Sequence, residues 1–284
     1  MCGWLETNHD FGKKEKMKSE TLRVTLIQSN LHWENKEANM EMFAKKINSI
    51  EEETDLILLP EMFTTGFSMK TSLAENENGK TIEWMKEVAR KKNCIICGSI
   101  IFSSFAEASA DKEEFYNRLI WMKPDGSFYS YNKKHLFGLG EENKFYTAGN
   151  ERIIVELNGW KICPLICYDL RFPVWSRQQH NNLYDVLLYV ANWPERRSGA
   201  WKKLLPARAI ENQAYTIGLN RVGEDGNKFN HSGDSMVVDA RGEILFHSAN
   251  EEKIFSVELK RDELERTQKE LPFLNDADEF TLQT

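Results

Sequence analysis

Apolar residues along this chain follow two different spacings. Short runs at 22–28, 55–59 and 184–191 alternate or are continuously apolar, which is typical of β-strands, and the continuous runs indicate strands covered on both faces. Residues 39–50 instead repeat apolar side chains every three or four positions, which predicts a helix. The same reasoning gives helices at 81–92 and about 199–214, and strands at 94–101, 119–122, 127–131, 153–157, 160–166, 215–219, 236–239, 243–247 and 254–259.

Turn residues separate several of these strands. Pro124-Asp125-Gly126, Asn158-Gly159 and Ala240-Arg241-Gly242 are typical of hairpins. Helices mixed with so many hairpins favour a two-sheet α/β sandwich over a purely parallel sheet. No linker, repeat or low-complexity tract interrupts the pattern. We therefore expect one domain over 21–260, a flexible N-terminal extension over 1–20 and a C-terminal tail over 261–284.

Composition narrows the class of protein. With 284 residues, 41% of them hydrophobic, the chain can bury a sizeable core. A net charge of −7 without a basic block argues against a nucleic-acid partner. No apolar run approaches the roughly 20 residues that span a bilayer, and the first twenty residues do not resemble a secretory signal. Five cysteines, an odd number, do not suggest a disulfide framework, so we expect a cytoplasmic protein.

Cys167 is the candidate nucleophile. The apolar run 160–166 delivers it, and the sequence becomes polar directly afterwards. A thiol at such a strand end lies at the edge of a sheet, and backbone N–H groups that follow it form an anion-binding nest if a helix begins there. Cys163, inside the apolar run, is the kind of cysteine that packs in a core.

Two other strand ends carry groups that suit a cysteine nucleophile. Glu61 follows the buried run 55–59, where a partly desolvated carboxylate is suited to act as a general base; a capping or ion-paired glutamate is the alternative. Lys133 and Lys134 follow the strand 127–131, where one ammonium can face developing negative charge, although paired lysines more often form a solvated face. Glutamates at 141 and 142 are near enough in sequence to orient such a lysine.

Taken together, these segments resemble the nitrilase, or carbon–nitrogen hydrolase, superfamily. The order, spacing and strand-end context all match, and the resemblance extends from about residue 22 to residue 259. The matching segments are Leu59-Pro60-Glu61-Met62-Phe63, Tyr131-x-Lys133-x-His135-Leu136-Phe137, Cys167-Tyr168-Asp169-Leu170-Arg171-Phe172-Pro173, Ala191-Asn192-Trp193-Pro194, Arg208-Ala209-Ile210-Glu211-Asn212-Gln213 and Gly233-Asp234-Ser235-Met236-Val237-Val238-Asp239.

The resemblance implies a four-layer α-β-β-α sandwich of two mixed sheets and a Glu–Lys–Cys triad. Glu61 would be the general base and Cys167 the nucleophile. Lys133 is the matching lysine, because it stands two residues before a histidine. Glu142, seven residues before a glycine, matches the second glutamate of the family, and the backbone N–H of Tyr168 would complete an oxyanion hole with the lysine. Neither a metal nor an organic cofactor is implied.

The residues after the cysteine resemble the omega-amidase branch, which releases ammonia from 2-oxoglutaramate and 2-oxosuccinamate. Arg171 supports this physically, because a guanidinium near the nucleophile can hold a substrate carboxylate with two hydrogen bonds. Its alternative role is an ion pair with Asp169 or a neighbouring helix. Trp193 and Phe63 are candidates for an apolar wall around the acyl chain, or for ordinary core positions.

The expected activity is therefore hydrolysis of the terminal amide of a small carboxylate-bearing substrate through a thioester. The alternatives are an aliphatic amidase or N-carbamoyl amino acid hydrolase of the same superfamily, and a catalytically silent, dimeric binding protein. Terminal tails in this superfamily often cover a neighbouring subunit, so we expect at least a homodimer.

Three further features of the sequence have simpler interpretations than they first suggest. Cys2 invites comparison with N-terminal-nucleophile amidotransferases, but the residues after it turn polar at once instead of forming a buried strand. Cys94 and Cys97 stand three apart in a predicted strand, so they face opposite sides and cannot hold one metal ion. Pro206 falls inside the helix at 199–214, where we expect it to kink or restart the helix.

Overall fold

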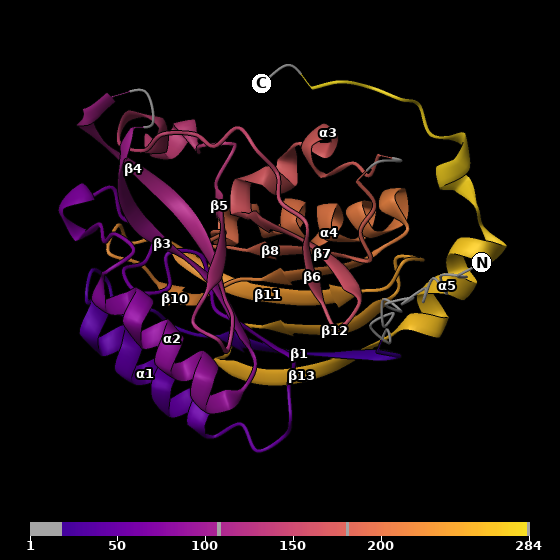
Figure 1. Cartoon of the computed structure of the whole chain (residues 1–284), viewed down its shortest axis with the longest axis horizontal. Coiled ribbons are helices and arrows are strands. Elements are labelled where there is room, and N and C mark those ends of the chain that lie inside the picture. The colour runs from indigo at the N-terminus through magenta and orange to yellow at the C-terminus, as the bar shows by residue number, and fades with distance from the viewer. Residues whose placement is uncertain (1–18, 107–108, 180–181, 283–284) are drawn as a thin grey trace, which may run out of the picture.

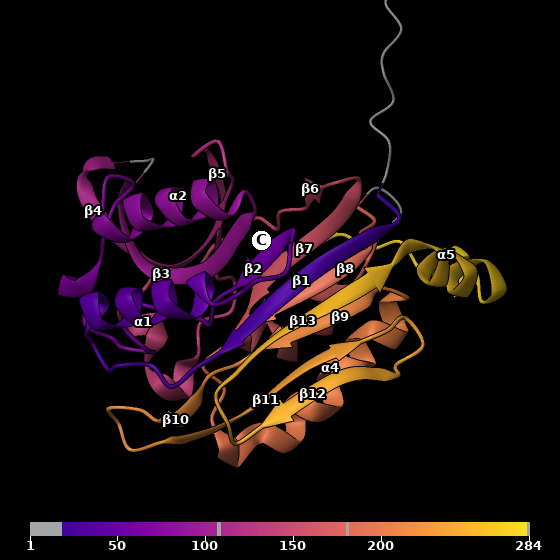
Figure 2. The ribbon, with the colours of Figure 1, turned by 90° about the horizontal axis from the view of Figure 1, so that it is seen from below.

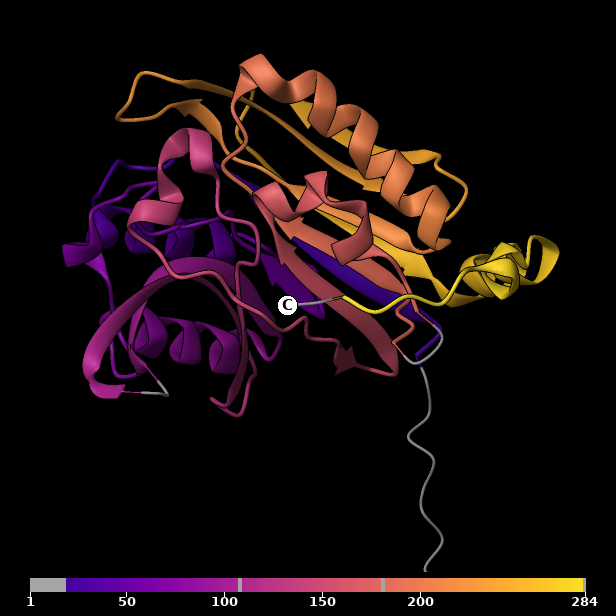
Figure 3. The same cartoon turned by 90° about the horizontal axis from the view of Figure 1, so that it is seen from above.

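Two mixed β-sheets face each other, and helices cover their outer faces (Figures 1 and 3). The computed structural model describes residues 19–106, 109–179 and 182–282. Cys2 and most of the predicted N-terminal extension lie outside these ranges. Among the described residues, no helix combines the length and the apolar character that crossing a membrane would require.

The first sheet has the strand order β13-β1-β2-β3-β4-β5. The pairs β1–β2 and β2–β3 are parallel, and the others are antiparallel. Figure 2 shows β1 and β13, which come from opposite ends of the chain, lying side by side. The strands are β1 (Thr21–Gln28), β2 (Leu56–Leu58), β3 (Ile95–Ala106), β4 (Ser109–Met122), β5 (Phe128–Asn132) and β13 (Lys253–Lys260).

The second sheet has the order β10-β11-β9-β8-β7-β6, with β12 paired to β11. Its three central strands, β7, β8 and β9, are parallel and almost wholly buried, as their continuous apolar sequences predict. The strands are β6 (Val155–Leu157), β7 (Trp160–Ile166), β8 (Val186–Val190), β9 (Tyr215–Leu219), β10 (Val222–Glu224), β11 (Asn230–Val238) and β12 (Ile244–Ala249).

Helices α1 (Lys36–Asn48) and α2 (Lys80–Lys92) cover the outer face of the first sheet, whereas α4 (Ser198–Asn212) covers the second. One apolar cluster lies between α1, α2 and the first sheet. A larger cluster joins both sheets and continues under α4. This arrangement confirms the expected α-β-β-α sandwich. The short helix α3 (Pro173–Ser176) follows β7, and α5 (Arg261–Glu270) follows β13.

Helix α4 continues through Pro206 without a break, so the proline does not mark a helix boundary. A proline removes the hydrogen bond to the carbonyl four residues earlier, here that of Lys202. The side chain of Lys202 is exposed, so that carbonyl lies on the face nearest to solvent. The cost of the missing hydrogen bond is therefore smaller than in a buried helix.

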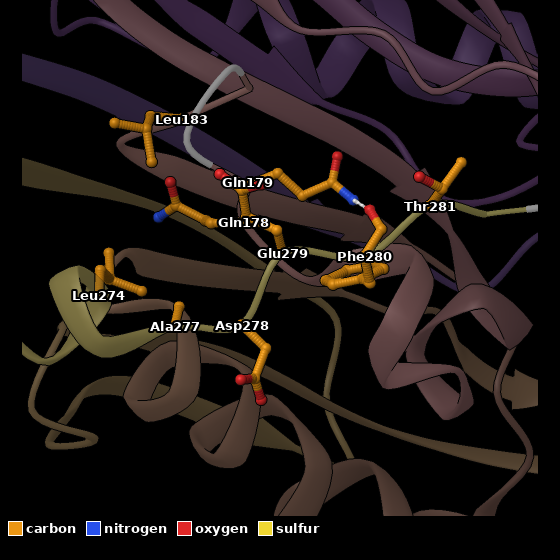
Figure 4. Close-up of a pocket in the computed structure, with 9 residues that line it drawn as sticks. All are labelled: Gln178, Gln179, Leu183, Leu274, Ala277, Asp278, Glu279, Phe280 and Thr281. Carbon is orange, nitrogen blue, oxygen red and sulfur yellow. Dashed lines mark hydrogen bonds between the residues drawn. The ribbon is translucent and has the colours of Figure 1, made fainter.

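The C-terminal segment begins as α5, whose Leu264 packs into the core shared by both sheets. Residues 271–282 then continue as an arm, with the 3₁₀ turn η6 at Phe273–Asp276, past the segment that follows α3 (Figure 4). The Nε2 atom of Gln179 donates a hydrogen bond to the carbonyl of Phe280 at 3.1 Å. A cavity of about 560 Å³ lies between the arm and this segment.

Candidate active site

The three side chains of the predicted triad come from segments that follow strands of both sheets, whereas Glu142 begins the 3₁₀ turn η3 (Glu142–Lys144). Glu61 lies three residues beyond β2 and Lys133 directly beyond β5, both in the first sheet. Cys167 follows β7, and Asn192 lies two residues beyond β8, both in the second sheet. Because the two sheets face each other, these strand ends meet in one place, although up to 131 residues separate hydrogen-bonded partners in the sequence.

Lys133 lies at the centre of this group, and its side chain is completely buried. Its Nζ atom contacts Glu61 Oε1 at 2.7 Å and Glu142 Oε2 at 2.9 Å, and neither carboxylate is accessible to solvent. Burial alone would lower the pKa of Lys133, but the charges of Glu142 and Glu61 outweigh it and raise that pKa. The ammonium therefore remains protonated and neutralises one of the two negative charges.

Asn117, in the middle of β4, connects the two carboxylates from a second direction. Its Nδ2 atom donates to Glu61 Oε1 at 2.8 Å and to Glu142 Oε1 at 3.0 Å. Burial is the main cause that raises the pKa of Glu142, the charge of Glu61 adds to it, and Lys133 opposes it. The remaining Glu61 oxygen, Oε2, accepts the backbone N–H of Asn192 at 2.7 Å. Both carboxylates are thereby held in fixed orientations.

Cys167 begins the 3₁₀ turn η4 (Cys167–Arg171) with a positive φ of 42°. A cysteine with this backbone conformation is uncommon and carries strain of the kind found at functional sites. Burial and the charge of Glu61 raise the pKa of the Cys167 thiol well above its usual value, although Lys133 partly opposes them; a hydrogen bond to Glu61 adds to the effect. The group is therefore a neutral thiol at rest, and it needs a base before it can attack.

Asp169 links the turn that carries Cys167 to the segment that carries Lys133 through hydrogen bonds. Its Oδ2 atom accepts the backbone N–H of Ile166 at 3.0 Å and the hydroxyl of Tyr131 at 2.8 Å. Its Oδ1 atom contacts the backbone N of His135 at 3.0 Å and the ring Nδ1 of the same residue at 2.8 Å. This buried carboxylate is thus fully occupied, and the alternative pairing of Arg171 with Asp169 does not occur.

A pocket opens above Cys167, with a volume of about 140 Å³. Lys133 and Tyr168 also line it, and the first N–H groups of a helical turn such as η4 have no acceptor within that turn. The ring of Trp193 forms one wall, and the guanidinium of Arg171 lies over that ring at 4.8 Å. Other lining residues are Phe67, Met69, Phe137, Leu139, Gly140, Asn192, Pro194, Arg196, Arg197, Asp225, Asn227, Phe229 and His231.

Comparison with known proteins places this arrangement in a family. Residues 23–269 match the model of the carbon–nitrogen hydrolase family. The chain belongs to the carbon–nitrogen hydrolase family. It is 42% identical to the omega-amidase YafV of Escherichia coli strain K12, over 92% of this chain and 98% of that protein. It is 31% identical to the 2-oxoglutaramate amidase of Bacillus subtilis strain 168, over 89% of this chain and 96% of that protein.

Solved structures agree with this assignment. The structure of XC1258 from Xanthomonas campestris, a CN-hydrolase superfamily protein with an arsenic adduct in its active site, matches with a TM-score of 0.88. The two sequences are 36% identical, and the match covers 93% of this chain and all of the other. The hydrolase described here therefore shares its fold with a member of the family along nearly its whole length.

Phe63 does not line the pocket of this hydrolase, which corrects its prediction as a substrate-binding residue. Its ring is completely buried in the cluster beneath α1 and α2. The ring centroids of Phe63 and Phe43 are 5.7 Å apart in an edge-on arrangement, and those of Phe63 and Trp84 are 5.8 Å apart. The residue after the turn at Met62 points away from the pocket, and Phe67 lines the pocket instead. Counting positions from Glu61 could not reveal this, because the chain reverses at Met62, where φ is 43°.

Several residues that contact the candidate catalytic group carried no sequence signal of their own, or a signal that only the structure explains. Asn117 is a polar residue inside a long strand, so it resembles an ordinary solvent-facing position. Asn192 lies within a motif that the resemblance identified, but its role as a donor to Glu61 depends on contact between the two sheets. The choice of Glu142 over Glu141 is consistent with the geometry, because Glu141 pairs with Lys144 at the surface.

Proposed function

We propose that this hydrolase is an omega-amidase that removes ammonia from the terminal amide of a small 2-oxo acid such as 2-oxoglutaramate or 2-oxosuccinamate. The observation that carries the proposal is the presence of Arg171 in the same pocket as Cys167. Within the described part of the chain, no carboxylate forms an ion pair with this guanidinium. A free guanidinium beside a buried thiol suits a substrate with a carboxylate at one end and an amide at the other.

In the first step, Glu61 accepts the thiol proton of Cys167 while Sγ attacks the amide carbon. Glu61 is close enough to Cys167 for its charge to raise the pKa of the thiol, so this carboxylate is placed to accept the proton. The carbonyl oxygen becomes an oxyanion, stabilised by the charge of Lys133 and the backbone N–H of Tyr168. Loss of one such donor typically costs about 3–4 kcal/mol of transition-state stabilisation.

In the second step, the tetrahedral intermediate collapses and the carbon–nitrogen bond breaks. Glu61 returns its proton to the departing nitrogen, so that ammonia leaves and a thioester on Cys167 remains. Glu61 then removes a proton from water, which attacks the thioester and releases the carboxylic acid and the thiol. Glu142 keeps Lys133 in position throughout by accepting from Nζ at 2.9 and 3.1 Å.

The test is ammonia release from 2-oxosuccinamate and 2-oxoglutaramate by the wild type, Cys167→Ala and Arg171→Ala. We expect Cys167→Ala to be inactive, and Arg171→Ala to raise the KM for acidic amides about tenfold or more. A wild type that ignores both acids but hydrolyses neutral amides or N-carbamoyl amino acids would replace this proposal with one of the alternatives in the family. A wild type that hydrolyses none of these compounds would favour a silent binding protein.

We propose further that the protein forms a homodimer and works in the cytoplasm. Apolar side chains on the C-terminal arm and beside it are exposed, which supports burial against a second copy; they are Val174, Leu183 and Phe273. The four cysteines in the described residues are free, which suits a reducing compartment. Light scattering after size-exclusion chromatography tests the dimer, since a mass of about 33 kDa would contradict it.

A further inference from the structure

Three arginines line the pocket, although the whole chain has a net charge of −7. Each guanidinium lies over an aromatic ring instead of an acidic side chain. Arg171 lies over Trp193 at 4.8 Å, Arg197 over Phe137 at 4.7 Å and Arg196 over Phe229 at 4.2 Å. In the part of the chain that the structure describes, none of the three forms an ion pair with a carboxylate.

The buried group formed by Lys133, Glu61 and Glu142 provides no free positive charge for a substrate carboxylate. Lys133 is shared by two glutamates, so the three side chains together carry no net positive charge that could attract a distant carboxylate. The lining residues include one carboxylate, that of Asp225, whose Oδ1 atom accepts the backbone N–H groups of Asn227 and Phe229. An anionic substrate that approaches Cys167 therefore depends on the arginines for its attraction.

Arg197 is the second arginine placed close to the nucleophile. It ends the 3₁₀ turn η5 (Glu195–Arg197), and its backbone carbonyl accepts the indole N–H of Trp193 at 2.9 Å. Its guanidinium covers Phe137, whose ring in turn meets the ring of Tyr168 edge-on at 5.0 Å. Trp193 thus contacts both Arg197 and Arg171. The rings of Phe137 and Tyr168 connect Arg197 to the turn of Cys167.

The surroundings of Arg197 are unfavourable for a cation without a partner. Partial burial and the neighbouring charge of Arg196 lower the pKa of this guanidinium, and Arg171 contributes in the same direction. The protein therefore maintains two like charges at one side of the pocket at some cost in stability. A bound anion would relieve that repulsion, since it can accept hydrogen bonds from both guanidinium groups.

We propose that Arg197 is a second carboxylate-binding residue, which acts together with Arg171 to select amides that carry a negative charge at the end opposite the scissile bond. The inference rests on the proposed function and adds a specificity residue to it. Arg171 and Arg197 reach the same pocket from η4 and η5, and they are near enough for their charges to interact, so one carboxylate can bind to both. The aromatic rings beneath them hold the guanidinium planes without neutralising them.

Arg196 provides a matched control, because it is the adjacent residue of the same type. It is exposed, whereas Arg197 is partly buried. It stacks on Phe229 at the outer edge, where it also borders a surface groove with Glu195 and Lys228. We therefore expect Arg196 to contribute to the general field but not to direct binding.

The experiment compares two substrates of the same chain length on purified enzyme. Succinamate carries a carboxylate, and butyramide has a methyl group in its place. The ratio of their kcat/KM values is measured for the wild type, Arg197→Gln, Arg197→Lys and Arg196→Gln, together with the inhibition constant of succinate. We expect Arg197→Gln to lower the ratio about tenfold or more through KM, and to weaken succinate inhibition similarly. Arg197→Lys should recover part of the loss, and Arg196→Gln should change the ratio less than about threefold.

Other outcomes would overturn the assignment. Equal losses on both substrates, with a lowered melting temperature, would mean that Arg197 is only structural. An unchanged ratio in Arg197→Gln, or equal effects of Arg196→Gln and Arg197→Gln, would mean that it makes no specific contact. If the wild type hydrolyses butyramide but no acidic amide, the proposed function itself fails; if it hydrolyses 2-oxosuccinamate but Arg197→Gln keeps its selectivity, only this inference fails.

Discussion

At the scale of single residues, the site depends on one cation that serves two buried carboxylates. Lys133, Glu61 and Glu142 have no exposure to solvent, so each charge depends on the others and on Asn117 for stabilisation. Burying charges is costly unless they are paired and hydrogen-bonded. The same burial that destabilises these groups makes their electrostatic effect on a reacting carbonyl strong.

Replacing Lys133 with methionine tests this dependence. We expect Lys133→Met to abolish activity and to lower the free energy of unfolding by about 3–5 kcal/mol, because two buried carboxylates lose their shared cation. Adding Glu142→Gln removes one of the two negative charges and should recover part of the lost stability, but no activity. Urea denaturation measures both effects. A single variant as stable as the wild type would contradict the buried charge arrangement.

At the scale of elements, the turn η4 must hold Cys167 in a strained conformation. Asp169 supplies that constraint, since it accepts donors from the end of β7 and from the segment after β5. Strain of about 1–3 kcal/mol at one residue persists only where the surrounding structure over-determines it. Asp169 is therefore a positioning residue, because it acts through the segments that it joins.

Asp169→Asn tests this role with a minimal change in shape. One amide nitrogen replaces an acceptor oxygen, so that two buried donors lose their partner and stability should fall by about 1–3 kcal/mol. We expect kcat to fall more than KM changes. Asp239→Asn is the matched control, because Asp239 accepts two backbone N–H groups in a surface turn. Equal losses of kcat in the two variants would rule out a positioning role for Asp169.

The hairpin formed by β10 and β11 contributes His231 to the pocket and predicts a dependence of stability on pH. Burial, with the nearby charge of Arg221, lowers the pKa of His231 to about 4, while Asp225 opposes this effect. The unfolded state binds the proton near pH 6.5, so stability is fully present above that pH and is lost as the pH falls toward 4.

His231→Asn should reduce this loss of folding stability at acidic pH. We expect the wild type to lose stability between pH 6.5 and 4 by an amount on the order of 3 kcal/mol from this group, and the variant to lose correspondingly less. Urea denaturation at pH 7 and pH 5 gives the comparison. His32→Asn, at an exposed position, is the control and should keep the wild-type slope. Identical slopes in all three proteins would mean that folding does not lower the pKa of His231.

At the scale of the whole molecule, the two sheets share one core. The apolar cluster between them includes Leu26 and Trp121 from the first sheet, and Ile162 and Leu188 from the second. Neither sheet can lose its partner without exposing this surface to water. The candidate catalytic residues, which are divided between the sheets, are therefore fixed only while the sandwich is intact.

The shared core predicts that the described domain unfolds as one unit. Circular dichroism and tryptophan fluorescence should report the same urea midpoint, and activity should be lost in the same transition. Trp121→Ala, at the centre of the shared face, should shift all three signals together by about 3–5 kcal/mol. Separate transitions for the two spectroscopic signals would show that the sheets unfold independently.

Most elements and most of the candidate site were predictable from sequence because they depend on local patterns. The apolar runs of β7 and β8 can only be covered strands, and the residues that follow such strands stand at a sheet edge. Hairpin β3–β4 extends further than its apolar residues indicated, because backbone pairing continues where side chains alternate with polar residues. Phe63 and Arg197 were misjudged or missed, since their positions depend on a chain reversal and on a neighbouring loop.

The sequence by itself predicted the candidate catalytic residues, since Glu61, Lys133 and Cys167 each follow a predicted strand and match a family in order and spacing. Only the tertiary structure decided what surrounds them: Asn117 and Asn192 as donors, Asp169 as the link between two segments, and Arg197 beside Arg171. The physical reason is the separation along the chain between the residues that interact. Strand periodicity is encoded by neighbours in the sequence, whereas the burial and pairing of charge depend on two sheets that meet only after the chain has folded.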